Sequence, residues 1–348
     1  MLENKKSIIE EIESLKKNLT GKVLIAAHHY QKKELIQIAD VIGDSYRLAV
    51  IASKSEAKTI ILCGVRFMAE SAALLARPDQ KILLPDFSAA CPMADMISPA
   101  AAEKALDRIV EITGEEALPL SYVNSWANLK ALTGLRKGST CTSGNAKKIM
   151  EYYLSKGKRI LFMPDKNLGI NTARSLGLVD SDFCFVSKEG FVPDSGANAR
   201  VFLWDGYCPV HLDLKAEHVK ELRAKFPSAR LMVHPECSED LVSLSDFTGS
   251  TEGMAKAIQE APADSQIAVG TEYRFIERMK KEYSEKEILP LKQVYCKDMD
   301  LINLENVLSV LRAYEDGKSD TYRVSIEEKT AINARKALST MIAITEGL

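Results

Sequence analysis

Short apolar runs alternate with segments of helical period along almost the whole chain. The runs are rich in Val, Ile, Leu and Phe and predict buried strands, and the segments between them predict amphipathic helices. This alternation favours parallel α/β sheets covered by helices. The predicted strands are Val23–Ala27, Thr59–Leu62, Lys81–Leu84, Leu118–Val123, Ser139–Cys141, Arg159–Met163, Arg200–Trp204, Arg230–Val233 and Gln266–Val269.

The nine predicted strands form three sets of three, near residues 23, 60 and 82, near 118, 140 and 160, and near 201, 230 and 267. We therefore expect three small α/β/α domains of three layers each, at residues 1–97, 98–180 and 181–309. The joints would be Ser98–Glu103 and the loop-like stretch Val179–Asn198, which is rich in Asp, Gly and Pro.

The end of the chain predicts one more helix. From Ser325 to Leu348 the apolar residues recur at helical spacing. We expect the C-terminal helical region, 310–348, to pack back on the first domain. The predicted apolar face consists of Ala331, Ala334, Ala337, Leu338 and Met341.

Composition and charge exclude several classes of function. Apolar residues make up 46% of the 348 residues, charged residues 27%, and the formal net charge is −2, which does not suggest a nucleic-acid or acidic-membrane partner. We expect neither a signal peptide nor a membrane span, because the acidic first residues and the short apolar runs fit neither. Seven dispersed cysteines favour a reducing cytoplasm over a disulfide framework.

The stretch Val201–His211, VFLWDGYCPVH, combines a predicted strand with reactive side chains. Asp205 and Gly206 end the strand, and the pair Cys208-Pro209 predicts a turn into a helix, since Pro fits the first helical position. Cys208 would then lie at a helix N-terminus, which favours a thiolate. The alternative is a buried structural cysteine with a surface His211.

Other polar groups follow the ends of predicted strands, where parallel sheets bind ligands. Both His28-His29-Tyr30 and His234-Pro235-Glu236 offer titratable side chains, and the second could share a proton between imidazole and carboxylate. The alternatives are one exposed and one core histidine in the first motif, and a surface pair in a turn in the second. The turns Thr142–Asn145 and Gly249–Thr251 suit an anion but equally suit ordinary helix caps. Two residues separate Cys208 from His211, which is a spacing found in zinc sites, but the chain has no second pair with the spacing of a zinc ribbon. Patterns alone predict a multi-domain α/β enzyme with an anion site.

An ordered set of strand-end motifs resembles the quinolinate synthase family, the A protein of bacterial NAD biosynthesis. The matching segments run nearly from end to end of the chain. They are AHHYQ (27–31), GDSYRLA (43–49), CGVRFMAESA (63–72), CPMADM (91–96), YVNSWANLKA (122–131), CTSGNA (141–146), MPDKNLG (163–169), GYCPVH (206–211), HPEC (234–237), GST (249–251), VGTE (269–272) and a late Cys296 with Met299.

The resemblance implies three α/β/α domains related by pseudo-threefold symmetry around a central active-site cavity. It implies one [4Fe–4S] cluster held by Cys91, Cys208 and Cys296, with one iron open to the substrate. Cys63, Cys141, Cys184 and Cys237 would not be ligands. The implied reaction is a transferase-type condensation of iminoaspartate with dihydroxyacetone phosphate to quinolinate, with loss of phosphate and two waters. An aspartate oxidase or dehydrogenase would be the functional neighbour that supplies iminoaspartate.

The resemblance also implies roles for single residues. Tyr30 and Glu236 would be the acid–base pair, and His211 would line the cavity near the iron. The residues expected to hold substrate carboxylates and phosphate are His28, Ser45, Tyr122, Asn124, Ser143, His234, Ser250 and Thr251.

Two other functions stay open at this point. One is a Zn-dependent lyase or aldolase on a phosphorylated substrate, with Cys208, His211 and His234 at its site. The other is a non-catalytic protein that binds small phosphorylated metabolites.

Overall fold

The protein is built on three separate sheets, and the strand pairs within each sheet are parallel. A computed structural model describes residues 2–348, with side chains from residue 5 onward. The chain divides into two compact units. Unit 1 comprises Met1–Cys91 and Tyr295–Glu327, and unit 2 comprises Pro92–Val294 and Glu328–Leu348. The predicted α/β class is confirmed.

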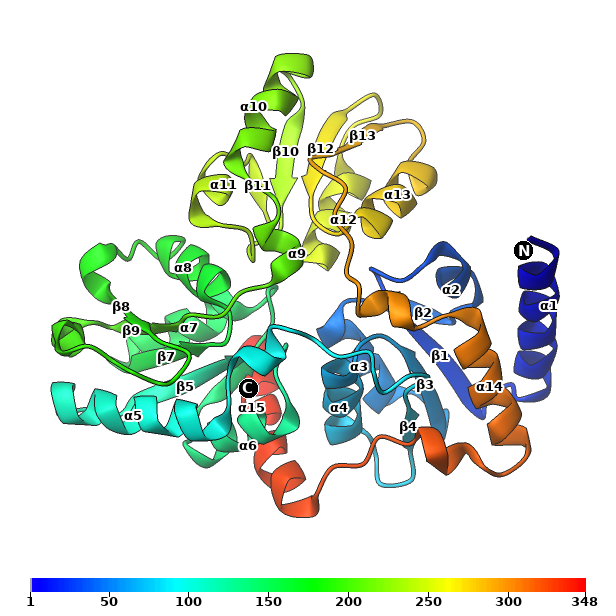
Figure 1. Cartoon of the computed structure of the whole chain (residues 1–348), viewed down its shortest axis with the longest axis horizontal. Helices are drawn as coiled ribbons and strands as arrows, with labels where there is room; N and C mark the ends of the chain where they lie inside the picture. Colours follow the sequence, from blue (N-terminus) through cyan, green and yellow to red (C-terminus); the bar gives the residue numbers. More distant parts are fainter. Residues whose placement is uncertain (1) are drawn as a thin grey trace. The chain divides into compact units, whose positions relative to one another are not determined.

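Unit 1 holds a four-stranded sheet in the order β2-β1-β3-β4 (Figure 1). The central strand β3, TIILC, is buried at every position, as expected of a strand covered on both faces. The strands are β1 (Val23–His28), β2 (Val41–Gly43), β3 (Thr59–Cys63) and β4 (Lys81–Leu83). The helices are α1 (Leu2–Asn18), α2 (Lys33–Ile38), α3 (Ser45–Lys54), α4 (Arg66–Leu75), α14 (Leu304–Glu315) and the short 3₁₀ turns η4 (Met299–Leu301) and η5 (Ser319–Tyr322).

Unit 2 holds a five-stranded sheet in the order β6-β5-β7-β9-β8. Its strands are β5 (Ala117–Tyr122), β6 (Ser139–Cys141), β7 (Arg159–Met163), β8 (Phe183–Val186) and β9 (Val201–Trp204). Around it lie α5 (Pro99–Thr113), α6 (Ala127–Leu135), α7 (Ala146–Ser155), α8 (Lys166–Arg174) and the 3₁₀ turns η1 (Ala94–Met96), η2 (Asp180–Asp182) and η3 (Asp194–Asn198). Phe202 and Trp204 of β9 pack in one core with residues of α5, including Ile109.

The third sheet also belongs to unit 2 and has the order β11-β10-β12-β13. Its strands are β10 (Arg230–Val233), β11 (Phe247–Thr248), β12 (Gln266–Gly270) and β13 (Glu287–Pro290). The helices of this part are α9 (Pro209–Leu212), α10 (Ala216–Lys225), α11 (Glu239–Ser243), α12 (Thr251–Glu260) and α13 (Tyr273–Glu282).

The predicted grouping of Val201–Trp204 with the strands near 230 and 267 is wrong. β9 pairs with β7 through Ile160↔Val201 and with β8 through Val186↔Trp204. The stretch Val179–Asn198, expected to be loop-like, contains β8 between two 3₁₀ turns. Ser98–Glu103, expected to be a joint, is the cap and first turn of α5, where Ser98 Oγ accepts from the Ala101 N–H at 3.2 Å. The predicted boundary at residue 180 divides the five-stranded sheet, because β8 and β9 follow it while β7 precedes it. The division of the chain into three domains stays a prediction.

The C-terminal helix α15 (Glu328–Glu346) packs within unit 2, against α6, β6 and α7. The prediction that region 310–348 packs on the first domain therefore holds for residues 310–327, which belong to unit 1, and is wrong for α15, which packs on α6 and β6. The predicted apolar face is confirmed, since all five of its residues are buried. Thr140 Oγ1 donates to Ala337 O at 3.3 Å, which ties β6 to this helix.

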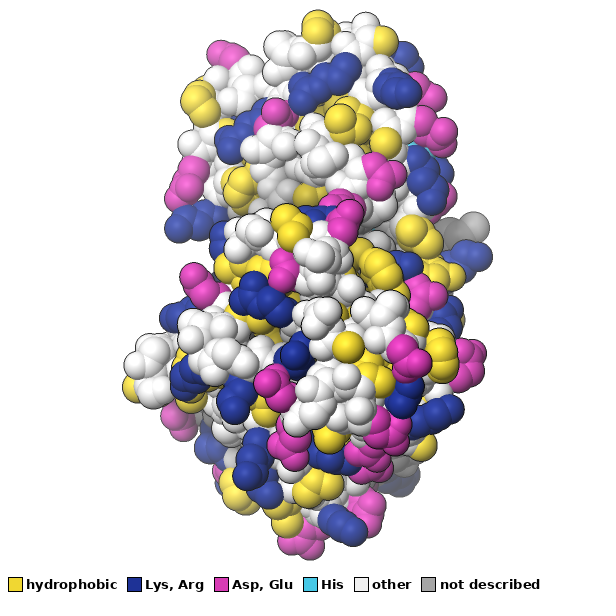
Figure 2. All heavy atoms as spheres, turned by 90° about the vertical axis from the view of Figure 1, so that its left-hand side faces the viewer, with side chains coloured by type: hydrophobic (Ala, Val, Ile, Leu, Met, Phe, Trp, Pro, Cys, Tyr) yellow, Lys and Arg dark blue, Asp and Glu magenta, His cyan; other side chains and the backbone are white. Residues whose placement is uncertain are grey.

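The surface carries mixed charges. On the face drawn in Figure 2, Lys and Arg side chains are interspersed with Asp and Glu. Within residues 2–348, no helix is long and apolar enough to cross a membrane.

Candidate active site

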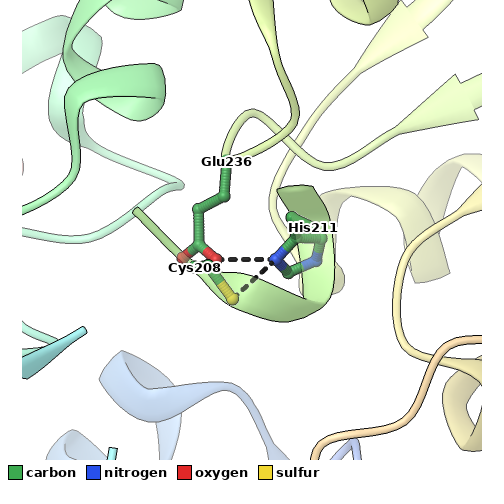
Figure 3. A group of neighbouring side chains, drawn as sticks. All are labelled: Cys208, His211 and Glu236. Carbon is green, nitrogen blue, oxygen red and sulfur yellow. Dashed lines mark hydrogen bonds and ion pairs between the residues drawn. The ribbon is translucent and has the colours of Figure 1, made fainter. Parts of the chain in front are cut away.

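Residues that follow the strands of unit 2 bring a thiol, two imidazoles and a carboxylate together. Cys208 and His211 follow β9, and His234 and Glu236 follow β10. Figure 3 shows the side chains of Cys208, His211 and Glu236 directed toward one another. Their position past the strand ends is the one at which parallel sheets bind ligands.

The turn that carries Cys208 has the predicted form. Cys208 is the N-cap of α9 with an extended backbone, and Pro209 occupies the first helical turn. Gly206 is needed just before it, because a Cβ there would lie 2.4 Å from Pro164 O. The Lys166 N–H donates to Gly206 O at 2.8 Å, which fixes the turn to the loop after β7.

His211 makes close contacts through both ring nitrogens. Its Nδ1 lies 2.7 Å from Glu236 Oε2 and 3.3 Å from Cys208 Sγ, and its Nε2 lies 2.9 Å from Thr271 Oγ1. The ring stacks on His234, with centroids 4.4 Å apart and an interplanar angle of 18°. His211 and Glu236 are both almost fully buried, so the expected surface His211 of the alternative interpretation is excluded.

Glu236 is the carboxylate of this group. Tyr122 Oη, at the end of β5, donates to Glu236 Oε1 at 2.6 Å. Burial alone would raise the pKa of Glu236, but charge interactions with His234 and His211 and hydrogen bonds from His211 and Tyr122 lower the pKa overall. A carboxylate bonded to an imidazole and a phenol can accept and return protons.

His234, unlike Glu236, favours its neutral form. Burial, together with the neighbouring His211, lowers the pKa of His234 to about 3, although Glu236 opposes this shift. His234 is therefore a neutral imidazole near neutral pH. It can donate or accept a hydrogen bond without adding charge to the site.

Three buried polar residues of unit 2 were not found from the sequence. Asp165 caps α8, accepts from the Leu168 N–H at 2.8 Å, and has its pKa raised by burial and by Glu236. Thr271 follows β12 and contacts His211. Lys130 is fully buried and donates to Val123 O at 2.8 Å and to Ser125 O. Asp165, Thr271 and Lys130 all lie within the recognised motifs, which was the available signal.

The two turns of unit 2 that could bind an anion, Thr142–Asn145 and Gly249–Thr251, lie next to each other. A Cβ at Gly144 would lie 3.4 Å from Ser250 Oγ, so the turn of Ser143 and the turn of Ser250 meet. Ser250 is the N-cap of α12 and accepts from the Gly253 N–H at 3.2 Å, as the cap interpretation expects. Thr251 is buried at the start of α12, and Asn124 is partly buried with Oδ1 unpaired among the described residues.

The remaining predicted site residues lie in unit 1. His28 ends β1, and its ring contacts that of Tyr30 edge-on with centroids 4.6 Å apart. The Tyr30 N–H donates to His28 Nδ1 at 3.1 Å. His28 and His29 are both buried, against the alternative of one exposed ring. Ser45 begins α3, and β2 places Gly43 beside His28.

Burial separates the seven cysteines into two classes. Cys63, Cys141, Cys184 and Cys237 are buried, and burial raises the thiol pKa of each, to about 12 for Cys63 and about 11 for Cys184. Cys91, Cys208 and Cys296 are the three that are only partly buried. Thiolates react from accessible positions with low pKa values, so the second class is the more reactive one.

Comparison with known proteins places the chain among named relatives. The family model described as "Quinolinate synthetase A protein" matches residues 10–343. The chain is 39% identical to the quinolinate synthase of Bacillus subtilis (strain 168), over 98% of this chain and 94% of that protein. It is 37% identical to the quinolinate synthase of Streptomyces coelicolor, over 97% of this chain and 88% of that protein.

Proposed function

Since this chain belongs to the quinolinate synthetase A protein family and is an enzyme, we propose that it condenses iminoaspartate with dihydroxyacetone phosphate to quinolinate in NAD biosynthesis. Phosphate and two waters leave in this reaction. The observation that carries the proposal is the family match over residues 10–343, which includes every predicted site residue. The buried His211–Glu236–Tyr122 group supports it, because such a reaction needs repeated proton transfers.

The proposed cofactor is one [4Fe–4S] cluster held by Cys91, Cys208 and Cys296. The donor set fits, because these are the three cysteines that are not buried. With three thiolates for four irons, one iron would remain open, and the bound cluster would supply a Lewis acid for a substrate oxygen.

Glu236 and Tyr30 would be the acid–base pair. Glu236 would take a proton from the substrate and return it, while His211 Nδ1 and Tyr122 Oη hold its two oxygens at 2.7 and 2.6 Å. Tyr30 would present its phenol beside His28, whose Nδ1 accepts from the Tyr30 N–H.

Both substrates are anionic and would be held by polar strand-end residues. Ser143, Ser250 and Thr251 lie before or at the N-termini of α7 and α12, two ten-residue helices whose first N–H groups favour anions. The other proposed substrate-binding residues are His28, Ser45, Tyr122, Asn124 and His234.

At the level of the whole chain, we propose three pseudo-threefold-related α/β/α domains around a central cavity, each built on one of the three parallel sheets, with β8 and β9 in the second domain. The three parallel sheets support this arrangement. The protein would act in the cytoplasm, next in sequence to an aspartate oxidase or dehydrogenase that forms iminoaspartate.

Glu236→Gln tests the proposed chemistry. The substitution keeps the shape of the side chain and removes its basicity, so quinolinate formation should fall by about 10²–10⁴-fold. The visible absorption of the cluster should be unchanged. Both are measured on anaerobically purified protein, with product followed by chromatography.

Two further variants serve as a control and as a test of the cluster ligand. Glu239, the first residue of α11, forms an ion pair with Arg174 of α8. Its substitution Glu239→Gln should retain activity. Cys208→Ala should lose both the cluster and activity. A Glu236→Gln protein with full activity, or a Cys208→Ala protein with full iron, would overturn the corresponding role.

A further inference from the structure

Three donor atoms from one unit converge in the part of the chain that the structure describes. They are Cys208 Sγ, His211 Nδ1 and Glu236 Oε2, and suitable ligand atoms of the three residues lie within 4.8 Å of one another (Figure 3). Sulfur, imidazole nitrogen and carboxylate oxygen are the three ligand types that Zn²⁺ takes in proteins. His211 and Glu236 are buried, whereas Cys208 remains partly accessible, which leaves a path for an ion.

We propose that the chain without its cluster binds one divalent transition-metal ion, such as Zn²⁺, through Cys208, His211 and Glu236. In a tetrahedral zinc site, the usual bond lengths place N and O about 3.4 Å apart and S and N about 3.6 Å apart. The observed separations are 2.7 Å for Nδ1–Oε2 and 3.3 Å for Nδ1–Sγ. The Nδ1–Oε2 separation therefore has to grow by about 0.7 Å and the Nδ1–Sγ separation by about 0.3 Å, which rotation of the side chains supplies.

Two neighbouring hydroxyls orient the ligands. Thr271 Oγ1, 2.9 Å from His211 Nε2, can accept from an Nε2–H and so leave the Nδ1 lone pair for the metal. Tyr122 Oη holds Glu236 Oε1 at 2.6 Å, which leaves Oε2 on the side of the thiol and imidazole. Ligands held in this way by outer partners are typical of built metal sites.

The ion replaces protons at these atoms. The Cys208 thiol releases its proton to solvent, and the imidazole proton of His211 resides on Nε2 instead of Nδ1. Three protein ligands leave the fourth zinc position to water, the arrangement found in open rather than structural zinc sites.

The site shares Cys208 with the proposed cluster, so the two occupants exclude each other. This consequence rests on the proposed function, whereas the metal site itself does not. Zn²⁺ bound first should prevent cluster assembly until a chelator removes it.

The test is a titration of the full cluster-free chain with Co²⁺, a spectroscopic substitute for Zn²⁺, under anaerobic conditions. We expect one Co²⁺ per chain, with a thiolate-to-metal absorption band. Cys208→Ser, His211→Gln and Glu236→Gln should each weaken binding at least about tenfold, and Thr271→Val about 10–100-fold, with recovery in Thr271→Ser. The matched controls, Cys91→Ser and Cys296→Ser, should bind Co²⁺ as the unaltered chain does.

A second measurement needs no variant. Zn²⁺ should protect Cys208 from alkylation in the unaltered cluster-free chain and leave Cys91 and Cys296 reactive. Absence of stoichiometric Co²⁺ binding would overturn the proposal. So would loss of binding in Cys91→Ser or Cys296→Ser, or equal protection of the three thiols, because each would assign the ion to the three cysteines together. None of these outcomes bears against quinolinate formation by the cluster-loaded protein.

Discussion

The seven cysteines differ in environment, although the sequence shows them as a scattered set. Four are buried with raised thiol pKa values, and three are partly accessible. A thiolate is the reacting form, so a high pKa and burial both slow alkylation. This contrast makes the ligand assignment testable without any variant.

We predict that iodoacetamide labels Cys91, Cys208 and Cys296 in the folded cluster-free chain and spares Cys63, Cys141, Cys184 and Cys237. Peptide mass spectrometry would identify the labelled residues, and the unfolded chain should label at all seven positions. With the cluster bound, the three reactive thiols should become protected. Rapid labelling of a buried cysteine in the folded state would contradict the assigned environments.

Lys130 is the largest charged side chain that is fully buried. Its ammonium group donates to Val123 O and Ser125 O and so holds the turn that carries Asn124. We predict that Lys130→Met lowers the free energy of unfolding by about 1–3 kcal/mol, because buried carbonyls lose their donor. Urea unfolding measures the change. The exposed Lys147→Met should change stability by less than about 0.5 kcal/mol, and an equal effect of both substitutions would refute the role of Lys130.

Single residues were predictable where the chemistry is local. Pro209 after Cys208 predicted the helix start, and α9 has it. Thr271 and Tyr122 could not be assigned as partners of His211 and Glu236 from patterns, because the contacts join residues 60 and 114 positions apart. Such contacts depend on strand order, which spacing along the chain does not encode.

At the scale of elements, α15 and α6 approach each other closely at Gly134. A Cβ at Gly134 would lie 2.0 Å from Asn333 O, a backbone atom of α15. Gly134 therefore permits the close approach of the two helices.

We predict that Gly134→Ala destabilises the protein by about 1–3 kcal/mol, because the helices must shift apart. Gly253→Ala is a matched control, since the nearest atom to a Cβ there is Ser250 Oγ at 3.5 Å. That control should be neutral or stabilising by up to about 1 kcal/mol. Chemical unfolding of the two variants tests the contrast, and a neutral Gly134→Ala would show that the helices are not in close contact.

Long apolar strands were predictable and their partners were not. Val201–Trp204 was predicted from its apolar run, but its pairing with the strands β7 and β8 was not. The strand β8 lies in a stretch rich in Asp and Gly, which the pattern indicated to be a loop. Short strands such as β2 and β11 have three and two residues, too few for a periodic signal. The apolar face of α15 was correct, whereas its packing surface was not, since amphipathicity does not identify a partner.

For the whole molecule, the sequence patterns predicted the α/β class, and the structure has three parallel sheets. The proposed cluster ligands are distributed over both units, with Cys91 and Cys296 in unit 1 and Cys208 in unit 2. Ligands so far apart along the chain leave no spacing motif. They were assigned by resemblance, and their partial exposure supports the assignment.

The central claim is that this chain makes quinolinate. The most direct measurement is product formation by the anaerobically purified, cluster-loaded chain given iminoaspartate and dihydroxyacetone phosphate. We predict quinolinate and inorganic phosphate in equal amounts, and no quinolinate when either substrate is omitted. A folded, cluster-loaded chain that forms no quinolinate from both substrates would contradict the account.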